Sequence, residues 1–216
     1  MILLYLLAGI VVFNCAFLIL FTKFVHFNPK NTQTEMVSPV SLIICAKNEA
    51  DHLTNHIPYW LEQDHPQYEI ILINDASSDK TLEIMETFAA KHPQVKIVDV
   101  ENNEAFWGNK KYALTLGIKK ASHQHMIFTD ADCKPASKYW LRKIASNFSS
   151  EKQIVLGFGS YEINPGWLNK IIRYETVVTA VQYFSYALAG NPYMGVGINL
   201  GYTQKVFYDN SGFVLH

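Results

Sequence analysis

The stretch that decides the fold lies at residues 126–133 and reads MIFTDADC. Its first half is a short apolar run that predicts a buried strand, and Asp130 and Asp132 follow where that strand should end. One or two carboxylates, completed by substrate phosphates, are the usual protein ligands of Mg²⁺ or Mn²⁺. The alternative is that both aspartates open a turn and cap the next helix, since Asp favours both settings.

Strands and helices are predicted to alternate along the chain around this stretch. The expected strands cover residues 40–45, 69–73, 95–100 and 125–129, and the expected helices cover 50–63, 80–91, 109–121 and 137–148. Ser78 or Asp79 is the expected N-cap of the second of these helices. The alternation predicts an α/β fold with a mostly parallel sheet flanked by helices, in which ligands bind outside the carboxyl ends of the strands.

Polar side chains cluster in the sequence where the expected strands end. Besides the two aspartates above, they are Asn48 and Glu49 after the first strand, Asp75 and Asp79 after the second, and Lys110 and Lys111 at the start of the third helix. Each has a structural explanation as well, because such residues also form turns, caps and solvated helix surface. Their convergence on one edge of the sheet favours a binding site, in which the lysines could meet a phosphate.

Composition limits the classes of function. The chain has 216 residues and a formal net charge of −1, which gives no electrostatic case for nucleic acid as a partner. Cys15, Cys45 and Cys133 form no Cys-x-x-Cys pair, so neither a zinc site nor a disulfide framework is indicated. We interpret all three as small core residues.

Residues 1–24 are expected to form a transmembrane anchor, because they are almost entirely apolar over about the 20 residues that a bilayer span requires. A cleaved signal peptide is the alternative, although the run is long for one and has no basic region before it. Lys23 and Lys30 follow the segment, so the rest of the chain is predicted to face the cytoplasm at an inner or cytoplasmic membrane. Residues 25–39 would be a linker and residues 40–216 the globular domain.

Three segments at the strand ends form an ordered set: VSLIICAKNE at 40–49, ILINDASSD at 71–79 and TDAD at 129–132. In order and spacing they resemble the nucleotide-sugar-binding half of the GT-A glycosyltransferases of family 2, and the resemblance covers about residues 38–216. It implies a GT-A fold and a nucleotide site formed by Ala46, Asn48, Glu49, Asp75, Lys110 and Asp130. It also implies that Asp132, with Asp130, holds Mg²⁺ or Mn²⁺.

The segment GVGINLGY at 195–202 is similar to the family's Gly-x-Gly-x-Asn-Leu segment. The resemblance places Gly195, Gly197 and Asn199 beside the donor sugar and the acceptor. The glycines would let backbone approach a ligand closely, and a plain turn into a strand is the alternative.

The chain departs from the family pattern in its last part. The acidic general base of the family and the Gln-x-x-Arg-Trp motif of processive synthases do not occur, and the one carboxylate side chain after Gly201 is Asp209. No catalytic residue is therefore assigned, the base is expected beyond His216, and the chain is interpreted as truncated at its C-terminal end.

The reaction that the resemblance implies is a metal-dependent, inverting sugar transfer at the cytosolic face of the membrane. The donor is a nucleotide-diphosphate sugar, favoured as a UDP-sugar over a GDP-sugar, and the acceptor is a lipid or a saccharide. A membrane-tethered module that binds a nucleotide sugar, or serves as a scaffold, without catalysis remains the alternative. A dinucleotide-binding domain is disfavoured, because no Gly-x-Gly-x-x-Gly follows the first strand.

Residues 167–189 are expected to form a long, aromatic-rich helix. Lys170, Arg173 and Glu175 near its start argue against a full membrane span, so a helix lying against the bilayer is favoured. A helix that covers the core is the alternative.

Overall fold

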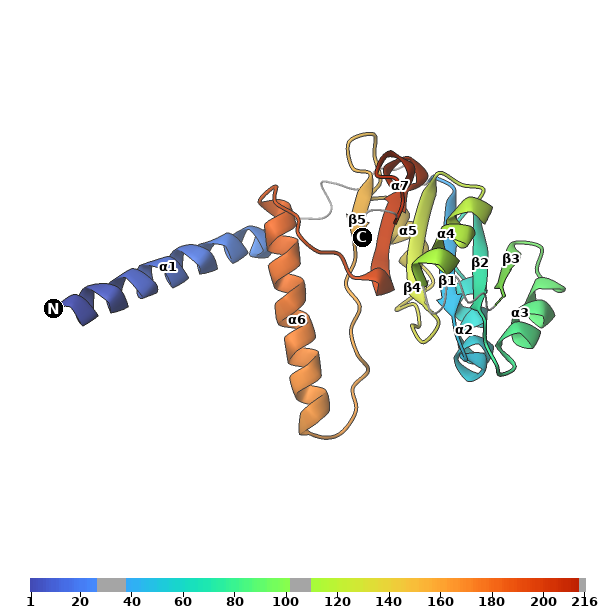
Figure 1. The fold of residues 1–216 in the computed structure, drawn as a ribbon, viewed down its shortest axis with the longest axis horizontal. Helices are drawn as coiled ribbons and strands as arrows, with labels where there is room; N and C mark the ends of the chain where they lie inside the picture. Colours follow the sequence, from blue (N-terminus) through green and yellow to red (C-terminus); the bar gives the residue numbers. More distant parts are fainter. Residues whose placement is uncertain (27–37, 102–109, 214–216) are drawn as a thin grey trace. The chain divides into compact units, whose positions relative to one another are not determined.

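The computed structural model describes residues 1–26, 38–101 and 110–213 (Figure 1). The chain divides into two compact units, of which the first comprises Met1–Thr32 with Phe158–Gly195 and the second Gln33–Gly157 with Val196–His216. Most of the linker predicted at 25–39, the helix start predicted at Asn109 and the chain end at His216 lie outside the described residues.

The second unit is built on a six-stranded sheet with the order β3-β2-β1-β4-β6-β5 (Figure 1). The strands are β1 (Val40–Ala46), β2 (Tyr68–Asp75), β3 (Val95–Val100), β4 (His125–Asp130), β5 (Ile154–Leu156) and β6 (Leu200–Thr203). β1 to β4 pair in parallel, whereas β6 is antiparallel to both β4 and β5. The predicted α/β class with a mostly parallel sheet is confirmed.

Helices cover both faces of this sheet. They are α2 (Ala50–Leu61), α3 (Thr81–Ala89), α4 (Lys110–Lys120), α5 (Trp140–Ala145) and α7 (Gln204–Asp209). Leu53, Met85 and Leu141 bring α2, α3 and α5 into one core cluster, while Ile118 and Phe207 bring α4 and α7 into the other. Because both faces are covered, every residue of β1 is buried, which explains why its sequence is apolar rather than alternating. Each large side chain buried in this way stabilises the fold by about 1.5–3 kcal/mol.

The structure differs from the sequence prediction mainly after β4. α5 begins at Trp140 rather than near Ser137, because the preceding backbone bonds to the segment after α2. The buried side chain of Gln63 donates to the Ser137 carbonyl at 3.2 Å and accepts from the Leu141 N–H at 3.1 Å. β5, β6 and α7 were not predicted, since each is short.

The first unit contains α1 (Ile2–Val25) and α6 (Trp167–Leu188). Two aromatic pairs join these helices: Phe17 with Tyr186, at 6.4 Å between ring centroids, and Phe24 with Phe184, at 5.5 Å. α1 is long and apolar enough to cross a membrane by length and composition, with a mean hydropathy of 2.6 over Ile2–Ile19. The helix predicted at residues 167–189 is confirmed to within one residue.

Candidate functional site

The carboxyl ends of β1, β2 and β4 bring most of the predicted residues to one edge of the sheet. The register places Ala46 beside Asn74 and Cys45 beside Asp130. The chain order reverses at β1, since β2 and β3 extend to one side of it and β4 lies on the other. In open α/β sheets such a switch point is where ligands bind, in the crevice outside the strand ends.

An ion pair between α4 and β4 occupies this edge. The Nζ atom of Lys110 lies 2.7 Å from Oδ1 of Asp130, and the two side chains are 54% and 36% exposed. Partial burial, which lowers the pKa of Lys110, is outweighed by the hydrogen bond and charge of Asp130, so the pKa lies above its ordinary value. At this exposure the pair contributes little to stability. Lys110 therefore stays protonated, and its charge balances that of Asp130 at the end of β4.

Asp132 is exposed in the turn that follows β4, next to Cys133. The Sγ atom of Cys133 lies 3.4 Å from Oδ1 of Asp132. Burial, together with the negative charge of Asp132, raises the pKa of this thiol to about 12, and burial raises the pKa of Cys45 to about 12 as well. Neither thiol therefore supplies a thiolate at neutral pH. The interpretation of the cysteines as core residues holds for Cys45 alone, because Cys15 is exposed on α1 and Cys133 is partly exposed.

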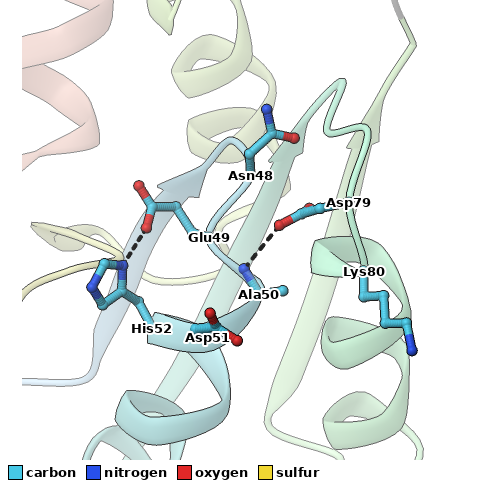
Figure 2. Close-up of a pocket in the computed structure, with 7 residues that line it drawn as sticks. All are labelled: Asn48, Glu49, Ala50, Asp51, His52, Asp79 and Lys80. Atoms are coloured by element: carbon cyan, nitrogen blue, oxygen red, sulfur yellow. Dashed lines mark hydrogen bonds and ion pairs between the residues drawn. The ribbon is translucent and has the colours of Figure 1, made fainter.

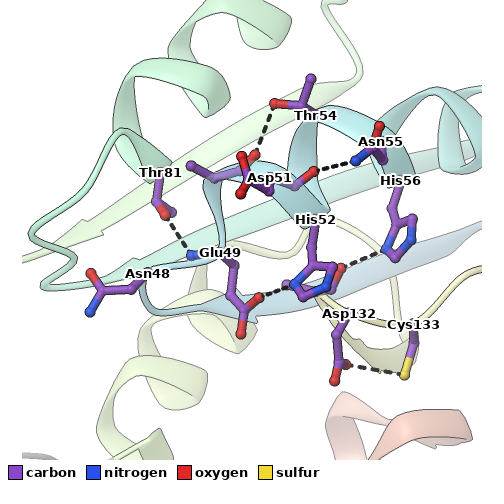
Figure 3. A network of polar contacts seen from close by, with 12 residues as sticks. Asn48, Glu49, Asp51, His52, Thr54, Asn55, His56, Thr81, Asp132 and Cys133 are labelled. Carbon is purple, nitrogen blue, oxygen red and sulfur yellow. Dashed lines mark hydrogen bonds and ion pairs between the residues drawn. The ribbon is translucent and has the colours of Figure 1, made fainter.

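The backbone between the two aspartates is held by α2. Nδ1 of His56 lies 2.9 Å from the carbonyl oxygen of Ala131, so this nitrogen carries the donated proton (Figure 3). The His56 ring also packs edge-on against Trp60, at 6.2 Å between centroids. His56 was not among the predicted site residues, because in the sequence it occupies an ordinary position of an amphipathic helix.

His52, one turn earlier on α2, holds the carboxylate of Glu49. Its Nδ1 lies 2.5 Å from Oε2 of Glu49 (Figure 2). This hydrogen bond raises the pKa of His52 above its ordinary value, and the charge of Asp132 acts in the same direction. His52 was also missed, although its spacing from Glu49 by three residues on a helix is a signal that could have found it.

The loops after β1 and β2 are joined by hydrogen bonds. At the start of α2 the backbone N–H groups of Asn48, Glu49 and Ala50 donate to Ser77 Oγ, Thr81 Oγ1 and Asp79 Oδ2 at 3.0, 2.8 and 3.3 Å. Figure 2 shows Asp79 reaching across to Ala50. The amides that a dinucleotide-binding domain presents to a pyrophosphate are therefore engaged with protein oxygens here. This finding weighs further against a dinucleotide-binding domain.

Asn48 and Asp79 shape these loops directly. Asn48 adopts a φ of 57°, and its Oδ1 accepts from the Ser78 N–H at 2.8 Å. Oδ1 of Asp79 accepts from the Thr81 N–H at 2.9 Å. The N-cap position of α3 is nevertheless Lys80, so the predicted N-cap at Ser78 or Asp79 was wrong by one or two residues. Asn is one of the few residues besides glycine that tolerates the left-handed region, since its side chain can bond locally.

A surface pocket of about 550 Å³ lies over the two loops (Figure 2). It is lined by Asn48, Glu49, Ala50, Asp51, His52, Asp79 and Lys80. Asp75, Asp130 and Asp132 lie outside its lining. Ala46 is buried in the core, at 1% exposure, and does not line this pocket. The predicted ligand residues thus form two groups, one on the loops and one at the end of β4.

Asn199 is fixed on two sides. It ends the short 3-10 helix η3 (Gly197–Asn199), its Oδ1 accepts from Trp140 Nε1 at 3.2 Å, and its carbonyl accepts from the Gly157 N–H at 2.8 Å. A Cβ atom at Gly157 would lie 2.3 Å from Cγ of Asn199, whereas one at Gly197 would meet open space. Gly195 belongs to the first unit of the chain, and Gly197 and Asn199 belong to the second.

The carboxylates at the end of β4 suit a divalent cation in part. Among the described residues, no group of three or more His, Cys, Asp or Glu side chains could hold a metal ion. Asp130 and Asp132 would therefore need oxygen ligands from a bound diphosphate, which is how Mg²⁺ is often held in proteins. The chemistry of the donor set fits Mg²⁺ or Mn²⁺ on that condition.

Comparison with known proteins supports a single family. Residues 41–208 match the sequence profile described as "Glycosyl transferase family 2". A poly-β-1,6-N-acetyl-D-glucosamine synthase of Staphylococcus epidermidis is 36% identical over 101 residues, which are 47% of this chain and 23% of the relative. A dolichyl N-acetyl-α-D-glucosaminyl phosphate 3-β-D-2,3-diacetamido-2,3-dideoxy-β-D-glucuronosyltransferase of Methanococcus voltae is 27% identical over 80% of this chain and 50% of its own length. The matched parts thus span 23% and 50% of the lengths of these two relatives.

Solved structures share the fold. The mannosyltransferase PcManGT of Pyrobaculum calidifontis, in complex with GDP-Man and Mn²⁺, superposes with a TM-score of 0.66 at 18% identity. That match covers 83% of this chain and 48% of the mannosyltransferase. TarS of S. aureus, in complex with UDP-GlcNAc, superposes with a TM-score of 0.56 at 20% identity over 80% of this chain and 47% of its own length. The expected GT-A fold is confirmed by these neighbours.

Proposed function

Because this chain belongs to glycosyl transferase family 2, we propose that it transfers a sugar from a nucleotide-diphosphate donor to an acceptor hydroxyl. The observation that carries the proposal is the group at the end of β4, where Lys110, Asp130 and Asp132 lie at the switch point of the sheet. A UDP-sugar is the favoured donor. TarS was solved with UDP-GlcNAc, and the S. epidermidis relative is named for N-acetylglucosamine. PcManGT, solved with GDP-Man, makes a GDP-sugar the alternative.

Within this proposal the residues at the end of β4 bind the diphosphate. Asp132, with Asp130 beside it, would hold Mg²⁺ or Mn²⁺, and a bound ion would offset the charge that develops on the leaving diphosphate. Lys110 adds a fixed positive charge on the same side. Asp75 and the pocket at Asn48 and Glu49 are proposed to receive the nucleoside.

We further propose an inverting single displacement, in which the acceptor hydroxyl attacks the anomeric carbon as the nucleotide diphosphate leaves. General-base assistance of this step typically contributes about 10²- to 10⁴-fold. We assign the base to none of the described residues. Gly197 and Asn199, on the segment before β6, are proposed to border the donor sugar and the acceptor.

The proposed location is a cytoplasmic membrane, with α1 as a single span and residues 40–216 facing the cytoplasm. The hydropathy of α1 supports the span. The two lysines that follow its apolar stretch in the sequence, Lys23 and Lys30, support the orientation. The acceptor would be a lipid or a saccharide. The name of the M. voltae relative includes dolichyl N-acetyl-α-D-glucosaminyl phosphate, a lipid-linked sugar, which favours an acceptor in the membrane.

Calorimetric titration of the full chain in detergent tests the donor site. UDP and GDP are each titrated with Mn²⁺ and with a chelator, against the native chain, Asp132→Ala and the control Asp209→Ala. Asp209 is a suitable control, because it is an exposed aspartate on α7 whose ion pair is with Lys205 of the same helix. We expect metal-dependent binding of one nucleotide, weakened about tenfold or more by Asp132→Ala alone, a loss of about 1.4 kcal/mol or more.

Equal UDP affinity in Mn²⁺ for the native chain and Asp132→Ala would overturn the metal assignment. Binding of neither nucleotide to the native chain would overturn the donor site itself. A separate assay of sugar release from the bound donor distinguishes a transferase from the non-catalytic binding module.

A further inference from the structure

The segment that contains α6, Phe158–Gly195, begins and ends next to residues of the second unit that lie close together. Its ends are joined there, because the N–H of Gly157, just before it, donates to the carbonyl of Asn199, just after it, at 2.8 Å. Asn199 immediately precedes Leu200, which pairs with Phe128 of β4. Residues 158–195 are therefore an arm whose two ends meet beside the strand that carries Asp130.

The first half of α6 exposes a set of large apolar side chains. Trp167, Leu168, Ile171 and Tyr174 are 79%, 70%, 60% and 72% exposed. Trp167, Ile171 and Tyr174 are spaced four and three residues apart, so they lie on one face of the helix. Of the 22 residues of α6, Ala180, Tyr183 and Ser185 alone are buried, which is unlike a helix that covers a core. An exposed apolar patch of this kind marks an interaction surface.

The helix α1 indicates what covers this face. Phe24 and Phe17, near the C-terminal end of α1, pack against Phe184 and Tyr186 near the C-terminal end of α6. The most apolar part of α1, Ile2–Ile19, ends before Phe24. The contacts of α6 with α1 therefore straddle the end of this apolar stretch, with Phe17 just inside it and Phe24 beyond it, and Figure 1 shows the two helices running crosswise.

The side chains near the start of α6 also suit the boundary between lipid and water. Nζ of Lys170 lies 5.0 Å from the ring centroid of Trp167, and Arg173 and Glu175 follow within two turns. Aromatic rings concentrate at membrane interfaces, where long basic side chains can keep their charge in water. Three charges within two turns make burial of this half in the hydrocarbon costly.

We propose that α6 lies along the bilayer surface, with the face of Trp167, Ile171 and Tyr174 in the headgroup region of the lipid. The proposal rests on α1 being a membrane anchor, as proposed above. The partner is a lipid bilayer, and neither a second copy of the chain nor another segment covers this face. The chain continues from this arm through residues 196–199 into β6 of the second unit. A helix on the bilayer surface suits an acceptor that is itself held in the bilayer.

Quenching of tryptophan fluorescence by brominated lipid tests the placement. The full chain is reconstituted in phosphatidylcholine vesicles whose acyl chains carry bromine near the headgroup or near the bilayer centre. We compare the native chain with Trp167→Phe, and with Trp140→Phe as a control for a half-buried tryptophan of the other unit. We expect Trp167→Phe to lose a large part of the quenching by the shallow bromines and little of the quenching by the deep ones, and Trp140→Phe to lose neither.

Two results would overturn the proposal. If Trp167→Phe leaves the quenching unchanged, lipid does not contact this face, and a second copy or another segment covers it. If it removes more quenching by the deep bromines, α6 enters the hydrocarbon rather than lying on its surface. The measurement requires neither donor nor turnover, so its failure is distinguishable from failure of the nucleotide titration.

Discussion

Replacing His56 by Phe tests whether α2 positions the two aspartates. The substitution keeps a ring of similar size beside Trp60 but removes the N–H that His56 donates to the carbonyl of Ala131 at 2.9 Å. Ala131 is 3% exposed, so water cannot easily replace that donor. A buried acceptor that loses its partner costs about 1–3 kcal/mol. For a protein of this size each kcal/mol lowers Tm by about 2–4 °C.

The same substitution should weaken the binding of nucleotide. Ala131 lies between Asp130 and Asp132, so its carbonyl helps to fix the turn from which both carboxylates project. If about half of the lost energy reflects the ligand-bound geometry of this turn, about 0.5–1.5 kcal/mol, metal-dependent affinity falls about two- to twelvefold. Binding in the presence of chelator should change less, because it does not require the two carboxylates to act together.

Thermal melting and calorimetric titration of His56→Phe, His56→Asn and His92→Phe separate a positioning role from a structural one. The Asn amide carries an N–H donor close to the place of Nδ1, so His56→Asn should recover part of the affinity. His92 packs against Phe88 at the end of α3, and its replacement should leave affinity unchanged. A His56→Phe protein that melts lower but binds nucleotide with native affinity in Mn²⁺ would refute the positioning role.

The remaining predictions concern packing, pH and charge. Gly157→Ala places a Cβ 2.3 Å from the side chain of Asn199 and should lower the free energy of unfolding by about 1–3 kcal/mol. Gly197→Ala faces open space and should leave Tm unchanged, but it should lower the affinity for a donor or acceptor that packs against this backbone. Both are checked by melting and titration, and equal melting of the two variants would contradict the packing argument. Burial, which alone would raise the pKa of Glu69, is outweighed by hydrogen bonds to its carboxylate, so its folded pKa lies below 4.5. The stabilising effect of the Glu69 carboxylate is therefore present above pH 4.5 and lost as pH falls through the folded pKa. In urea unfolding, the free energy of unfolding should fall more steeply with decreasing pH for the native chain than for Glu69→Gln. Parallel pH dependence of the two proteins would contradict this prediction. Lys110→Met removes a positive charge and should weaken nucleotide binding about tenfold at low salt and less at high salt, because salt screens the attraction to the phosphates. Titration at two ionic strengths measures this difference, and an equal loss at both would contradict the prediction.

Much of the central part of the fold could be predicted because β1, β2 and β4 are apolar runs that are buried over most of their length. β3 is only partly buried and contains Lys96 and Asp99, yet its bounds, Val95 to Val100, match the prediction. β2 and β4 extend to Asp75 and Asp130, beyond the last apolar residue, because pairing with a neighbouring strand rather than side-chain character sets where a strand ends. β5 and β6 have three and four residues, too few for a periodic pattern.

The candidate site was predictable where it depends on strand ends and unpredictable where it depends on contacts between distant elements. Asp130 and Lys110 meet because both lie at the carboxyl edge of a parallel sheet, which follows from the order of the elements. The contact of His56 with Ala131 joins residues 75 apart, and that of Trp140 with Asn199 joins residues 59 apart. Such contacts depend on how helices pack over the sheet, and local patterns carry no information about that.

The hydrogen bonds at the start of α2 explain why this edge would need side-chain charge to bind a diphosphate. In a dinucleotide-binding fold, amides at the helix N-terminus and the helix dipole attract the phosphates. Here the N–H groups of Glu49 and Ala50 donate to Thr81 and Asp79, so these two amides at the start of α2 are already engaged and are not offered to a diphosphate. Its charge would have to be offset by Lys110 and by a cation held at the carboxylates after β4. Asp130 and Asp132 would repel a diphosphate on their own. With a cation held between them and the diphosphate, the same two carboxylates would contribute to binding it.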